Sequence, residues 1–111
     1  MIIVVDLGTS AVSLVDGDDF TAFHVLVEGA ARHEGADAVA SVLGGDGASI
    51  DESHVFVAVD AVRRLAAPSD DEWERGFAAM RGYAESKGWT SPDGSMIRAH
   101  LEWAGRGGSP A

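Results

Sequence analysis

The chain opens with MIIVVDLGTSAVSLVDGDDFTAFHVLVE (residues 1–28), the segment from which the predicted sheet is built. It holds three apolar runs of strand length, separated by turns that contain Gly and Asp. The runs are residues 2–5, 12–15 and 20–27. Because short turns between consecutive strands are typical of hairpins, the sequence predicts a three-stranded antiparallel meander.

A helix and a fourth strand are predicted next. Residues 36–43 place Ala, Val and Leu at helical spacing, and Gly44-Gly45 follows as a stop signal. Residues 54–59 are continuously apolar, like residues 2–5, and such runs are typical of strands covered on both faces. Since a helix and a loop over residues 46–53 precede the fourth strand, we expect that strand to lie beside residues 2–5 and parallel to them.

The clearest element is a long helix over residues 71–87. Ser69-Asp70-Asp71-Glu72 matches a capping box with Ser69 as the cap, and Asp60 is expected to cap a short helix over 61–67. The apolar stripe of the long helix is Trp73, Phe77, Met80 and Ala84. Residues 96–103 then alternate between apolar and polar side chains, which predicts a half-exposed strand at an edge of the sheet.

We therefore expect a single small α+β domain over residues 1–104. Its N-terminal meander is extended to a mixed sheet of about five strands, with one long and two short helices packed on it. The length of 111 residues and the 46% hydrophobic content suffice for one core. Residues 105–111, GRGGSPA, are expected to be a disordered C-terminal tail.

The charge and the cysteine content of the chain limit the classes of partner and the cellular compartment that we expect. The formal charge of −10 repels phosphate backbones and anionic membranes, so we expect neither nucleic-acid nor membrane binding. The chain has no cysteine and no basic segment ahead of an apolar run, which favours a cytoplasmic location. Its four histidines show no short metal-ligand spacing, since a three-histidine site would require three separate elements to converge. The sequence therefore indicates no metal and no cofactor.

In the first hairpin, the turn Asp6-Leu7-Gly8-Thr9-Ser10 joins two predicted strands. This hairpin resembles the first phosphate loop of the actin, heat-shock chaperone and sugar-kinase superfamily. That resemblance implies backbone N–H groups and a hydroxyl directed at nucleotide phosphates, with the Asp serving a metal ion. It covers only the first hairpin. Those enzymes close two large domains over the nucleotide, and 111 residues make one small domain without a second phosphate loop. A tight hairpin is thus the favoured interpretation.

Asp6 and Asp60 are candidate catalytic residues if the first and fourth strands are parallel neighbours. Both carboxylates would then arrive at one end of the sheet, where they could hold a magnesium ion. The predicted element order also resembles the ribonuclease H fold, in which acids at such places bind two metal ions, and Asp37 would match a third acid. The alternative is structural, with Asp6 as a turn residue and Asp60 as a helix cap.

The polar face of the last strand gives a second catalytic candidate. Arg98, His100 and Glu102 place an imidazole between a cation and a carboxylate, and the pair His100 and Glu102 could perform acid–base chemistry in a cleft. The alternative is a solvated edge strand whose charges prevent other chains from pairing with it.

Candidate binding residues are Tyr83, Trp89 and Arg98. Neither Tyr83 nor Trp89 fits the core pattern, and exposed large aromatics are typical anchors of protein contacts. The leading hypothesis is a non-catalytic protein-interaction or accessory module, with a homodimer through the last strand or the Trp89 and Tyr83 surface. The alternative is a small enzyme or ligand-binding protein with a pocket between the sheet and the long helix.

Overall fold

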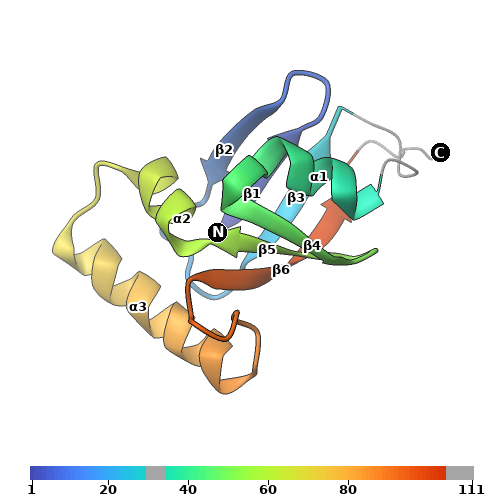
Figure 1. Ribbon diagram of the computed structural model, residues 1–111. Helices are drawn as coiled ribbons and strands as arrows, with labels where there is room; N and C mark the ends of the chain where they lie inside the picture. The colour runs from blue at the N-terminus through green and yellow to red at the C-terminus, as the bar shows by residue number, and fades with distance from the viewer. Residues whose placement is uncertain (30–34, 105–111) are drawn as a thin grey trace.

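The computed structural model describes residues 1–29 and 35–104 and shows an α+β domain (Figure 1). Its elements are β1 (Ile2–Asp6), β2 (Ala11–Val15), β3 (His24–Glu28), α1 (Gly35–Leu43), η2 (Gly44–Asp46), β4 (Gly47–Asp51), β5 (His54–Ala58), α2 (Val59–Ala66), α3 (Asp71–Ser86) and β6 (Met96–Trp103). The predicted fold class is confirmed, and the described residues form a mixed sheet of six strands where we expected about five.

The six strands follow the order β2-β1-β3-β6-β5-β4. β1 pairs with β2 antiparallel and with β3 parallel, and β3 pairs with β6 parallel. β5 is antiparallel to both of its neighbours, β6 and β4.

The prediction of an N-terminal meander is wrong in one respect, because it placed β3 beside β2, whereas β3 lies beside β1. β3 runs opposite to β2, as expected, yet it pairs with β1 on the far side from β2. The connection after Val15 passes the start of β1. Two hydrogen bonds hold it there, from the Met1 amine to the carbonyl oxygens of Asp19 (2.8 Å) and Ala22 (3.0 Å). A bond from the Trp73 indole Nε1–H to the Gly17 carbonyl oxygen (2.7 Å) also holds this connection, so it is not a tight hairpin.

The predicted pairing of the first and fourth strands is also wrong. β3 and β6 lie between β1 and β5, and β5 runs antiparallel to β6 and hence opposite to β1. β6 itself lies inside the sheet and not at its edge. Its apolar and polar alternation reflects a sheet with one covered face and one open face, a pattern that does not depend on being an edge.

Residues 47–51, expected to be loop, form the edge strand β4. They pair antiparallel with β5 across the turn at Glu52 and Ser53. Four of the five β4 residues are exposed, so the apolar pattern that identifies a strand is missing there.

The core lies between one face of the sheet and the helices. α1 contacts β4 and β5 near one edge and β2 at the other, and α2 contacts both β2 and β5, so the sheet curls around these helices. Figure 1 shows α1 across this face, and α3 beside the end where β6 begins. The strand residues that point to the helices are buried: Ile3, Val5, Val25, Val27, Val55, Val57, Ile97, Ala99 and Leu101.

Two predicted caps are corrected. α2 begins at Val59 with Ala58 as its cap residue, and Asp60 lies in its first turn without capping it. α3 begins at Asp71, and the Asp70 carboxylate, not Ser69, accepts a hydrogen bond from the Trp73 backbone N–H (2.8 Å). Asp and Ser are equally favourable N-cap residues. With Asp70 as the N-cap, α3 starts one residue later than a capping box with Ser69 as the cap implies.

Within the described ranges, no helix combines the length and the apolar character that a membrane crossing requires. The predicted tail, residues 105–111, lies outside the described residues, as does His33.

Candidate interaction face

The open face of the sheet, opposite the helices, carries a row of three histidines. β-sheet partners that lie directly opposite point to the same face. The register pairs His24 with His100 and His100 with His54, so the row crosses β3, β6 and β5. No pattern in the sequence predicts this row, because three elements that are distant in the sequence converge to form it.

Each outer histidine of the row faces a carboxylate. His54 Nδ1 lies 2.9 Å from Asp51 Oδ1, and His24 Nε2 lies 3.4 Å from Glu102 Oε1. The hydrogen bond from His54 lowers the pKa of the Asp51 carboxyl, and a second bond from the Ser53 backbone N–H adds to the effect. The His54 and His100 ring centroids are 5.4 Å apart with an edge-to-face tilt of 68°.

The structure brings the three predicted binding residues together. The Tyr83 and Trp89 rings meet edge to face with centroids 5.9 Å apart, and the Arg98 guanidinium lies 5.5 Å from the centre of the Trp89 ring. Lys87 Nζ lies 5.5 Å from the centre of the Tyr83 ring. We call these four residues, Tyr83, Lys87, Trp89 and Arg98, the Trp89 cluster.

The Trp89 cluster is fixed by the chain around it. The Trp89 backbone N–H donates to the Ala84 carbonyl oxygen (2.9 Å), and its carbonyl oxygen accepts from the Arg98 N–H (2.7 Å). Gly88, at φ 76°, lets the chain turn from α3 toward β6. Tyr83 remains 58% exposed, while Trp89 and Arg98 are half-buried.

Asp6 and Asp60, predicted as a catalytic pair, lie at opposite ends of the sheet. Asp6 ends β1, whereas Asp60 follows β5, which runs the opposite way. The Asp6 carboxylate accepts the backbone N–H groups of Gly8 (2.8 Å) and Thr9 (3.2 Å), which is a turn role. Asp60 is exposed beside Arg63, and Asp37 is exposed in the first turn of α1. The two-aspartate metal site is therefore not formed.

His100 and Glu102, the other predicted catalytic pair, stand on the open face. Both are exposed, and the Glu102 carboxylate turns toward His24. Between α3 and β6, where a pocket was expected, a hollow of about 160 Å³ is lined by residues that include Ala78, Gly82 and Ile97. Small-molecule pockets usually exceed about 300 Å³.

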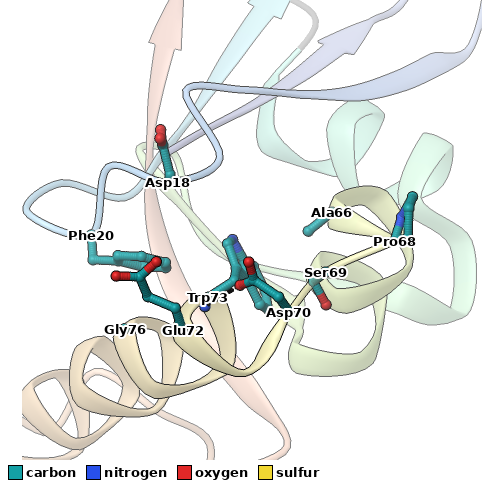
Figure 2. Close-up of a pocket in the computed structure, with 9 residues that line it drawn as sticks. All are labelled: Asp18, Phe20, Ala66, Pro68, Ser69, Asp70, Glu72, Trp73 and Gly76. Carbon is teal, nitrogen blue, oxygen red and sulfur yellow. Dashed lines mark hydrogen bonds between the residues drawn. The ribbon is translucent and has the colours of Figure 1, made fainter.

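A larger cleft of about 620 Å³ lies at the start of α3, and Figure 2 shows the residues that line it. Phe20 and Trp73 form its aromatic wall, with ring centroids 5.9 Å apart. Asp18, Asp70 and Glu72 add carboxylates, and none of the described residues that line the cleft is basic. Phe20 packs directly on the helix backbone at Gly76, where an added Cβ would lie 2.6 Å from the Phe20 Cδ2 atom.

Gly76 and Gly82 give a matched pair of substitutions on α3. We expect Gly76→Ala to destabilise the fold by about 1 kcal/mol, because the clash with Phe20 outweighs the better helix propensity of alanine. Gly82→Ala, where an added Cβ meets nothing within 4 Å, should stabilise by about 0.5–1 kcal/mol. Urea denaturation measures both. In a Phe20→Ala background Gly76→Ala should become stabilising, and a result that stays destabilising there would refute the clash as the cause.

The described carboxylates with shifted pKa values organise turns. Hydrogen bonds from Ser95 and Ser91 lower the pKa of Asp93 to about 2, and a bond from the Thr21 hydroxyl lowers the pKa of Asp19. Across residues 1–29 and 35–104, no three or more His, Asp or Glu side chains are arranged to hold a metal ion.

No protein-family model matches the chain, and no match was found among curated proteins or among solved structures.

Proposed function

We propose that the protein is a non-catalytic interaction module that binds a partner protein through the Trp89 cluster and the adjoining open face of the sheet. The observation that carries this proposal is the convergence of Tyr83, Trp89 and Arg98 on one surface. Tyr, Trp and Arg are the residues in which interface binding energy is most often concentrated.

Burial of exposed apolar surface would drive this binding, and the loss of side-chain freedom would oppose it only weakly. A partner that covers Tyr83 would bury a large apolar ring whose side chain is now 58% exposed. Because Trp89 is already held by backbone hydrogen bonds and by the Arg98 guanidinium, little side-chain entropy would be lost on binding. The formal charge of −10 speeds the long-range approach of a basic partner, while Lys87 and Arg98 make the Trp89 cluster itself locally cationic.

Self-association is one form of this proposal. The last strand cannot provide a free edge, because β6 is paired on both sides. A homodimer would instead form through the Trp89 cluster. Sedimentation velocity at several concentrations tests it, and a monomer at high concentration would leave a different protein as the partner.

The partner test uses Tyr83→Ala with Ile50→Ala as its control. Ile50 is another exposed apolar side chain (40%), and it lies on the edge strand β4. We expect Tyr83→Ala to weaken binding by about 2 kcal/mol, or about 30-fold, because it removes a central anchor. Ile50→Ala should leave binding unchanged.

Affinity capture from the native source followed by titration calorimetry with the purified partner provides the measurement. Equal binding by the parent protein and Tyr83→Ala, or a loss confined to Ile50→Ala, would place the interface elsewhere. If the parent chain captures no specific protein and stays monomeric, the proposal fails.

The cleft in Figure 2 supports a second candidate, a ligand-binding role. Its volume is within the range of small-molecule sites, and its aromatic wall and carboxylates suit a small organic cation. Trp73 and Tyr83 are ten residues apart on α3, about 15 Å along the helix, so the two sites are separable. Gly76→Ala should disturb only the cleft, and Tyr83→Ala only the Trp89 cluster.

A further inference from the structure

His54 and His100 form a cross-strand pair with close side chains. They lie directly opposite each other on the antiparallel strands β5 and β6. The Leu101 N–H donates to the Ser53 carbonyl oxygen (2.7 Å), so the neighbouring residues are the hydrogen-bonded pair. His54 and His100 therefore occupy a non-hydrogen-bonded position, in which side chains approach each other most closely.

The geometry points to a binding site for a late first-row divalent metal ion, such as Zn²⁺, Ni²⁺ or Cu²⁺, between the imidazoles of His54 and His100. Imidazole nitrogen is a preferred ligand of these ions. The ring centroids are 5.4 Å apart, which allows both rings to turn toward one ion above the strand pair.

The Asp51 carboxylate prepares His54 for this role. An ionised carboxylate only accepts hydrogen bonds, so His54 Nδ1 carries the proton in the 2.9 Å contact with Asp51. Neutral His54 then has its lone pair on Nε2, on the other side of the ring. This carboxylate–histidine arrangement is the usual support of metal-ligating histidines.

The site has two protein ligands and open coordination positions. His24 is the third histidine of the row, and His100 lies between it and His54. The Nε2 atom of His24 faces Glu102. This agrees with the absence of three-residue metal groups among the described side chains. Water or a partner group would fill the remaining positions. Arg98, two residues before His100, is the basic residue of β6, while Asp51 and Glu102 supply negative charge nearby.

The test is a titration of the 111-residue chain, free of any histidine tag, with NiCl₂ and with ZnCl₂ at pH 7.5, followed by calorimetry and by NMR of the histidine ring protons. We expect one ion per chain and changes at His54 and His100. Binding should disappear in His54→Asn and in His100→Asn at concentrations that saturate the parent chain. It should weaken about tenfold in Asp51→Asn, which removes the support of the ligand.

His24→Asn is the matched control, because it changes a histidine of the same row and should keep full affinity. Circular dichroism verifies that each variant is folded. The assignment is overturned if the parent chain binds neither ion, if His54→Asn and His100→Asn keep binding, or if His24→Asn loses it equally. Because the titration contains only the purified chain and the metal ion, its result is independent of the proposed protein interaction.

Discussion

Replacing Phe77 by alanine is expected to destabilise the protein by about 3–5 kcal/mol, the range for removing a fully buried aromatic ring. Phe77 has no exposed surface, and the Trp73 ring lies 4.8 Å away between centroids. The guanidinium groups of Arg63 and Arg81 lie 5.8 and 5.5 Å from the centre of its ring. Alanine would leave a cavity among side chains that α2 and α3 hold in place, so it cannot fully collapse.

Urea denaturation followed by circular dichroism measures this loss. Tyr83→Ala is the control, since it truncates an aromatic residue of the same helix that is 58% exposed, and it should change stability by no more than about 0.5 kcal/mol. Small domains are stable by only about 5–15 kcal/mol, so Phe77→Ala removes a large part of the total. A loss below about 1 kcal/mol would mean that α3 is not docked through Phe77.

The elements that the sequence predicted well are those specified by neighbouring residues. α1, α3 and β6 lie within one residue of their expected limits, because helical spacing, stop glycines and strand alternation are local signals. The edge strand β4 carries no such signal, since four of its five residues are exposed.

The order of the strands could not be predicted in the same way. The position of β3 depends on the connection after Val15, which is held by the indole of Trp73, 56 residues from its acceptor Gly17. No local pattern reports such a contact. The wrong strand order also made the predicted two-aspartate site wrong, because the pairing of Asp6 with Asp60 required β1 and β5 to be neighbours.

The Trp89 cluster and the histidine row differ in the same respect. Tyr83 and Trp89 are close in sequence, and their failure to fit the core stripe was visible from spacing alone. Alternation along β6 placed Arg98 and His100 on its polar face, but only the strand order shows that His24 and His54 flank His100. Chemistry that arises from register across separate strands stays hidden until the topology is known.

The turn after β1 depends on a glycine that the sequence analysis did not single out. Gly29, just after β3, has φ 77°, and the Asp6 carboxylate and the Gly8 backbone lie against it. A Cβ at Gly29 would clash with Asp6 Oδ1 and lie 2.8 Å from the Gly8 nitrogen. The Leu7 N–H donates to the Glu28 carbonyl oxygen (2.9 Å), so the two segments cannot separate easily.

Gly29→Ala is therefore expected to destabilise the protein by about 2–4 kcal/mol, combining a left-handed backbone with a clash against a fixed turn. Gly94→Ala is the matched control, because Gly94 has nearly the same φ, 75°, and an added Cβ there meets nothing within 4 Å. That variant should lose only about 1 kcal/mol, the cost of the backbone conformation alone. Urea denaturation of both variants isolates the clash as their difference. Equal losses would show that Asp6 and Gly8 do not pack on Gly29, and the structural role assigned to Asp6 would then have to be abandoned.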